Sequence, residues 1–164
     1  MPLQILLLLH LLGVIVWVGG MFFAYFCLRP AAVQVLEPPL RLRLWAATFD
    51  PFLKFTAAAV AVIILTGLAM VLHVGFRLAP VGWHVMLSLG FVMASVFGYV
   101  YGVLYPRLRS QCTASTWAAA AATLNAIRRL VAVNLVLSLG AIAAAAAGQV
   151  DAVHWLRSRG YRTP

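Results

Sequence analysis

Long apolar stretches alternate with short polar or charged segments along the whole chain. Four stretches are long enough to cross the roughly 30 Å hydrocarbon core of a bilayer as helices, which rise about 1.5 Å per residue. They cover residues 3–28, 51–76, 83–105 and 130–150. Because helices joined by loops reverse direction, this pattern predicts an all-α integral membrane protein. We expect an antiparallel bundle of four transmembrane helices that forms a single domain over residues 1–164.

Prolines and charged residues mark the predicted ends of these spans. Arg29-Pro30 ends the first span, and Pro106 stops the third. Asp50 precedes Pro51, which fits a helix N-cap followed by proline at the first helical position. The alanine-rich segment before the fourth span has high helix propensity, which allows the helix of that span to begin near Ser115. The two larger loops then cover residues 29–50 and 106–129.

Composition identifies the solvent and excludes some partners. The chain is 65% hydrophobic with a mean hydropathy of +1.01, and 9% of its residues are charged, against about a quarter in soluble domains. Twelve Lys and Arg outnumber three Asp and Glu, which gives a net charge of +9. These charges flank apolar spans and form no single basic face. They therefore indicate anchoring in an anionic lipid bilayer, and no nucleic-acid partner is expected.

The distribution of positive charge predicts the orientation. Eight basic residues lie in or beside the two larger loops: Arg29, Arg41, Arg43, Lys54, Arg107, Arg109, Arg128 and Arg129. The opposite side holds four: Arg77, Arg157, Arg159 and Arg162. The positive-inside rule then places both loops in the cytoplasm and both termini in the periplasm of a bacterial inner membrane. The first span lacks a basic leader, so we expect it to be retained in the protein.

Histidines are the main candidates for chemistry. The chain has four of them, His10, His73, His84 and His154, and the alternating helix directions predict that all four lie near the same, outer face. His10 is about 10 Å below the membrane edge. Ionisable or metal-binding side chains at such depth are rare and usually functional. His154 is followed by Trp155 and is predicted to lie at the interface.

Helical spacing selects companions for these histidines. On the first span one stripe contains His10, Gly13, Val14, Trp17, Gly20 and Ala24. Its small residues allow close approach of a neighbouring helix or of a flat cofactor. Met70 and His73 share a helix face on the second span. Met86 is about 200° around the helix from His84, so these two side chains share one ion only if the helix start is irregular.

Two cofactors fit these candidates. A b-type haem would take His10 and either His73 or His84 as axial ligands. Copper(I) favours imidazole with thioether, and Met70 and Met86 lie near histidines in the sequence. Acidic residues are nearly absent from the spans, so carboxylate-based catalysis is unsupported and no catalytic residue is assigned. If the protein is an enzyme, we expect a haem-dependent membrane oxidoreductase.

Two further features bear on partners. Gly98-x-x-x-Gly102 predicts a close packing contact, with homodimerisation as the alternative. Asn134 lies in the fourth span, where an unbonded amide is costly, and we expect it to bond another helix. Binding of a quinone or a polar head group at Asn134 is the alternative.

Three segments carry a family resemblance: residues 10–22 (HLLGVIVWVGGMF), 83–87 (WHVML) and 127–135 (IRRLVAVNL). In their order and spacing they resemble the copper-resistance protein D (CopD) family. The first segment is also similar to the first helix of HemJ-type protoporphyrinogen oxidases. The resemblance implies a four-helix inner-membrane module, with copper handling in one branch and haem chemistry in the other. HemJ-type enzymes are expected to use a first-helix histidine, matched by His10, and a lysine whose place Met86 takes here, which argues against protoporphyrinogen oxidation.

Three functions therefore remain open. A CopD-like protein would bind copper on the outer side for import or resistance, with His10, His73 and Met70 or Met86 as ligands and a periplasmic copper protein as partner. A b-type cytochrome would exchange electrons with a quinone or a periplasmic electron-transfer protein. A structural subunit would use its histidines only for bonds between helices.

Overall fold

The computed structural model describes residues 3–158, and the side chains of residues 3–146 within that range. Every regular element in this part of the chain is helical. Four helical segments are long and apolar enough to cross a membrane: Leu3–Val35, Pro38–Val74, Val81–Thr113 and Trp117–Ala146. The predicted all-α membrane protein with four transmembrane helices is therefore confirmed.

The first segment is a continuous helix whose pitch changes twice. It consists of α1 (Leu3–Val14), the π-helical turn η1 (Ile15–Gly19), α2 (Gly20–Phe22), a second π-helical turn η2 (Phe23–Leu28) and α3 (Arg29–Val35). The predicted end at Arg29-Pro30 is wrong, because Pro30 occupies the start of α3, where a missing N–H costs little. The helix ends only at Leu36, which has extended backbone angles.

The remaining elements also extend past their predicted ends. They are α4 (Pro38–Val74), α5 (Val81–Tyr99), the π-helical turn η3 (Val100–Leu104), α6 (Tyr105–Thr113) and α7 (Trp117–Ser158). Pro51 lies inside α4, so Asp50 is no N-cap. Its carboxylate instead accepts hydrogen bonds from Lys54 and from the Tyr105 hydroxyl. Pro106 follows η3 as Pro30 follows η2 and does not stop its helix.

The two segments predicted as loops are therefore mostly helical. Between the long helices the described chain has only short connections, at residues 36–37, 75–80 and 114–116. Gly75 adopts a φ of 94° at the end of α4, a conformation that favours glycine. The alanine-rich segment forms the first turns of α7, as predicted.

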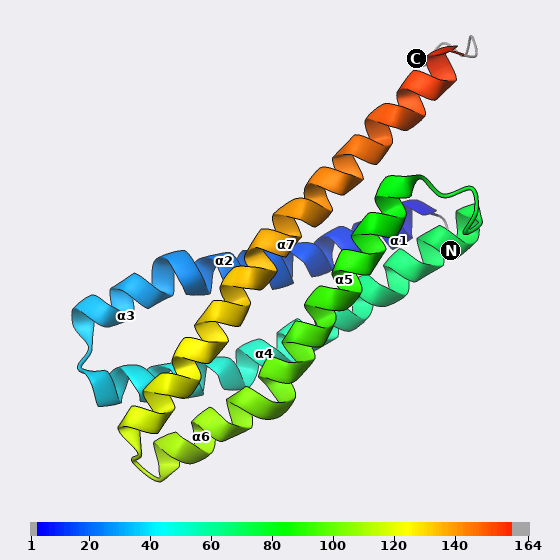
Figure 1. Cartoon of the computed structure of the whole chain (residues 1–164). Coiled ribbons are helices and arrows are strands. Elements are labelled where there is room, and N and C mark those ends of the chain that lie inside the picture. Colours follow the sequence, from blue (N-terminus) through cyan, green and yellow to red (C-terminus); the bar gives the residue numbers. More distant parts are fainter. Residues whose placement is uncertain (1–2, 159–164) are drawn as a thin grey trace.

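The four segments form two antiparallel pairs (Figure 1). The first segment lies against α4, and α5–α6 lies against α7. The start of α1 and the turn at 75–80 are at one end of the bundle, and the connections at 36–37 and 114–116 are at the other. We call these the histidine end and the arginine end. The last part of α7 extends beyond the other helices at the histidine end.

Packing is densest toward the arginine end. One cluster of buried side chains joins α4, α6 and α7 there, and it includes Leu42, Trp45, Phe49, Leu108, Leu124 and Ile127. A smaller cluster in the middle of the bundle includes Trp17, Met21, Ile63 and Met93. The buried core therefore lies mostly between the histidines and the arginine end.

Glycines divide into two groups by what surrounds them. A Cβ atom on Gly13 would lie 2.7 Å from Ile63 Cγ1, and one on Gly20 would lie 2.5 Å from Phe52 Cε2, so both positions bring the first segment close to α4. Gly98 and Gly102 have no described neighbour within 4 Å of such an atom. The predicted packing contact within the chain is therefore wrong for this pair, and homodimerisation stays a prediction.

Candidate functional site

A pocket of about 220 Å³ lies between the two helix pairs toward the histidine end. All four spans contribute to its wall, and nearly every lining side chain is apolar. Its most distinctive members are His10, Trp17, Trp83, Met86, Met93 and Ser138. The pocket is thus an apolar cavity with a single imidazole among the described side chains that line it.

His10 is held in a defined orientation. Its side chain is buried, with 9% of the residue exposed. Nδ1 lies 3.1 Å from the carbonyl oxygen of Ile63 and 3.0 Å from Oγ1 of Thr66, both on α4. The Thr66 hydroxyl donates its own proton to the carbonyl of Val62 at 2.6 Å, which leaves its oxygen free to accept. Both partners of Nδ1 are therefore acceptors, and Nδ1 carries the proton.

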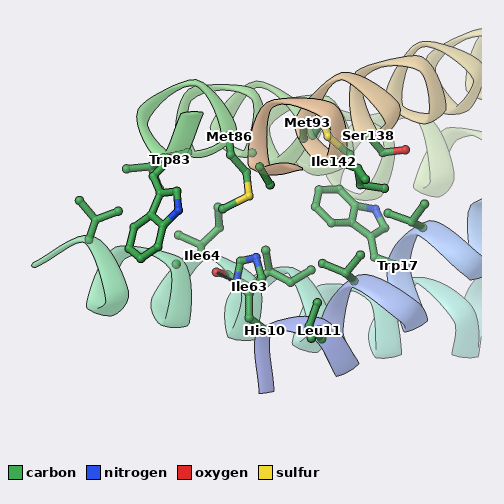
Figure 2. A pocket seen from close by; sticks show the side chains of 18 residues that line it. His10, Leu11, Trp17, Ile63, Ile64, Trp83, Met86, Met93, Ser138 and Ile142 are labelled. Carbon is green, nitrogen blue, oxygen red and sulfur yellow. Dashed lines mark hydrogen bonds between the residues drawn. The ribbon is translucent and has the colours of Figure 1, made fainter. Parts of the chain in front are cut away.

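This arrangement leaves the other ring nitrogen available. Nε2 of His10 has no hydrogen-bond partner among the described residues, and the imidazole faces the pocket (Figure 2). A neutral imidazole protonated at Nδ1 presents a lone pair at Nε2. Metal-binding histidines commonly have this arrangement, with the second nitrogen bonded to a carbonyl.

Gly67 makes room for the ring. A Cβ atom at this position would lie 3.3 Å from Cε1 of His10. Since that is tighter than an ordinary van der Waals contact, a larger side chain would press on the imidazole. The sequence Thr66-Gly67 thus supplies both the hydrogen-bond acceptor and the space that His10 needs.

Met86 enters the pocket from the wall opposite His10 (Figure 2). It belongs to α5, and its sulfur is directed toward the cavity. Met93, about two helical turns further along α5, is buried and also lines the pocket. Among the described residues, no three His, Cys, Asp or Glu side chains gather into a metal-binding group. The nitrogen and sulfur donors that the described lining offers a metal are therefore one imidazole and two thioethers, while the Ser138 hydroxyl donates to the carbonyl of Leu135.

The other predicted ligands lie outside this pocket. His73 is exposed near the end of α4, and Met70 is buried within α4 without lining the pocket. His84 has Nδ1 3.2 Å from the carbonyl of Pro80 and Nε2 2.9 Å from that of Phe76. Its ring therefore holds the turn at 75–80. The side chain of His154 lies outside the described residues.

Of the predicted stripe on the first span, only part faces the pocket. Trp17 lines it, on the π-helical turn η1, and packs edge-on against Phe97 with ring centroids 6.1 Å apart. Gly13 and Gly20 contact α4 instead. The prediction that Asn134 bonds another helix is confirmed, since its Nδ2 donates to the carbonyl of Met93 at 3.2 Å.

Sequence reasoning missed Thr66, Met93 and Trp83 as parts of the site. Thr66 carried a usable signal, because a threonine beside a glycine in the middle of an apolar span is a common helix-contact pair. Met93 and Trp83 carried none, since apolar side chains on a span are equally suited to facing lipid.

A family comparison agrees with this architecture. The family model for copper resistance protein D matches residues 46–147, more than half of the chain. The chain belongs to the copper resistance protein D family. The matched part contains α5 and most of α4 and α7, and with them Thr66, Gly67, Met86 and Met93, while His10 precedes it. No curated protein and no solved structure matches. The likeness of this CopD-family chain to HemJ-type oxidases stays a prediction.

Proposed function

We propose that this membrane protein binds copper(I) in the pocket, with His10 and Met86 as ligands, and thereby takes part in copper handling. The observation that carries the proposal is the orientation of His10. Hydrogen bonds from Nδ1 to α4 hold the ring, while the unbonded Nε2 faces the thioether of Met86 across the pocket. A copper ion would be the cargo of this site.

The donor set supports copper(I) over other metals. Thioether sulfur is a soft ligand that suits copper(I), whereas zinc sites use thiolate, imidazole and carboxylate donors and magnesium and calcium sites use oxygen donors. Among the described residues, no acidic side chain and no cysteine lines the pocket. His73 and Met70 have no part in this proposal because neither lines the pocket.

We further propose that the histidine end faces the periplasm of a bacterial inner membrane. The arginine end carries most of the basic residues, which favours the cytoplasmic side. The pocket would then exchange copper with a periplasmic copper protein, for import or for resistance. The haem alternative has less support, because both nitrogens of His84 face backbone carbonyls and His73 lies away from the pocket.

Competition titration tests the proposal. Detergent-purified protein should withdraw one copper(I) per chain from a chromogenic copper(I) chelator. The variant His10→Gln should lose this binding, while the matched control His73→Gln, at an exposed histidine, should retain it. Circular dichroism shows whether the helices remain intact. Equal binding by the wild type and His10→Gln would contradict the proposal, as would a Soret band in the purified protein that depends on His10.

A further inference from the structure

A second candidate site lies at the arginine end and shares no residue with the pocket. Arg128, on α7, borders two cavities there. The larger, of about 190 Å³, lies between the start of α4 and the first turns of α7 and is lined in part by Arg41 and Asn125. The smaller, of about 30 Å³, is lined in part by Arg29 and Trp45. Three guanidinium groups, from α3, α4 and α7, therefore border two cavities that share Arg128.

Hydrogen-bond donors in this region lack acceptors. Nε of Arg128 is buried and has no partner among the described residues, and the same is true of Nε1 of Trp45, a residue only 3% exposed. The guanidinium of Arg128 lies over the Trp45 ring, 5.7 Å from its centroid, and donates once, to Oδ1 of Asn125 at 3.2 Å. Buried donors without acceptors cost free energy, so an acceptor that entered this region and bonded to them would stabilise it.

The described part of the chain offers no such acceptor with a charge. Its single ion pair joins Asp50 to Lys54, at 2.8 Å, and does not include Arg128. Glu37 is exposed and pairs with no described cation. The arginines instead contact aromatic faces, as Arg29 does at Tyr25 and Arg128 at Trp45. A group of guanidiniums without a carboxylate partner favours an anion from outside the chain.

We propose that the larger cavity binds the phosphate group of an anionic phospholipid, with Arg41 and Arg128 as its ligands. Guanidinium groups bind phosphate oxygens through paired, charge-assisted hydrogen bonds. The cavity lies at the end of a transmembrane bundle, the depth at which lipid headgroups occur. Anionic lipid attracts basic side chains there, and basic pockets between helices hold headgroups. Trp45 acts as a platform that fixes the Arg128 guanidinium.

Native mass spectrometry in detergent tests this site. Wild-type protein supplied with phosphatidylglycerol should carry one tightly held lipid, and phosphatidylcholine should not replace it. Arg128→Gln and Arg41→Gln should each reduce the bound fraction by tenfold or more. The control Arg107→Gln removes one charge from an exposed position on α6 outside both cavities and should leave the lipid bound. Arg128→Lys, which keeps the charge and loses the Nε donor, should fall between wild type and Arg128→Gln.

The same measurement can overturn the proposal. Equal loss of lipid in Arg107→Gln would show only diffuse attraction between charges, and equal binding of phosphatidylcholine would remove the requirement for an anion. Thermal unfolding with inorganic phosphate separates the two sources of the ligand. Stabilisation by millimolar phosphate that depends on Arg128, without lipid adducts, would overturn the lipid as the source. Copper binding should be unchanged in all four variants, since none of these residues lines the pocket.

Discussion

The Nδ1 atom of His10 lies 3.0 Å from the hydroxyl oxygen of Thr66, which belongs to the neighbouring span. The two residues are 56 positions apart in the sequence, and their contact, together with that of Nδ1 to the Ile63 carbonyl, fixes the tautomer and the direction of the imidazole. The Thr66 hydroxyl accepts from Nδ1 and donates to the carbonyl of Val62, so two consecutive hydrogen bonds hold the ring.

Thr66→Val should weaken copper(I) binding by about tenfold, the lower end of the loss seen when a metal-binding histidine loses its outer partner. Valine keeps the shape of threonine and removes the acceptor, while the carbonyl of Ile63 remains. The matched control is Thr56→Val, at a buried threonine of α4 whose hydroxyl has no described partner. Chelator competition measures both. Equal affinity of Thr66→Val and wild type would show that the second acceptor does not hold the ring.

Met86→Leu should lower copper(I) affinity by at least tenfold, because leucine fills the same volume without a donor sulfur. Met70→Leu makes the same exchange at a buried methionine outside the pocket and should bind copper as the wild type does. X-ray absorption spectroscopy of the loaded protein should show sulfur among the copper ligands, and this signal should disappear in Met86→Leu alone. Retention of the sulfur signal in Met86→Leu would indicate that Met93 is the thioether ligand.

Gly13→Ala should destabilise the bundle by about 1–3 kcal/mol, the usual cost of overpacking. The new Cβ would lie 2.7 Å from Cγ1 of Ile63 and 3.2 Å from the backbone oxygen of Ala59, and the backbone cannot move aside. Gly98→Ala meets no described atom within 4 Å and should be neutral or slightly stabilising. Unfolding in mixed micelles compares the two. A large loss in Gly98→Ala with none in Gly13→Ala would reverse this interpretation and indicate a second copy at Gly98.

His84→Ala should loosen the turn at 75–80 without removing copper. Its ring contacts the carbonyls of Phe76 and Pro80 and packs edge-on against the Phe76 ring at 4.6 Å. Amide hydrogen exchange in this turn should become faster, while the copper stoichiometry stays at one. His73→Ala, at an exposed residue, should change neither. Loss of copper in His84→Ala with an unchanged exchange rate would restore His84 as a ligand.

The number of spans and their antiparallel arrangement could be predicted, because apolar stretches of twenty residues usually form transmembrane helices and short connections reverse the chain. The ends of the helices could not. Pro30 and Pro106 are read as stops, yet each follows a π-helical turn and occupies the start of the next α-helix. Pro51 is read as a start, yet α4 continues through it. Whether a proline ends a helix depends on the packing of the chain around it, which a linear pattern does not contain.

For the site, the depth of His10 in an apolar span was enough to select it. Its surroundings were harder to predict, because they come from three other spans. Helix phase correctly separated Met86 from His84, which are two residues apart. The phase of one helix relative to another is decided by contacts such as Gly13 against Ile63. Without these contacts the sequence cannot show that Met70 faces away from the pocket and Met86 into it.

The position of Trp17 has a consequence for how cargo would move. Its indole borders both the pocket and a cavity of about 30 Å³ that Thr56 and Asn134 line. With Trp17 packed against Phe97, the pocket and this cavity are separate. In the proposed function, a metal ion bound beside His10 would move toward the arginine end only if Trp17 separated from Phe97. A pocket separated in this way would suit the transfer of copper between carriers on one face of the membrane.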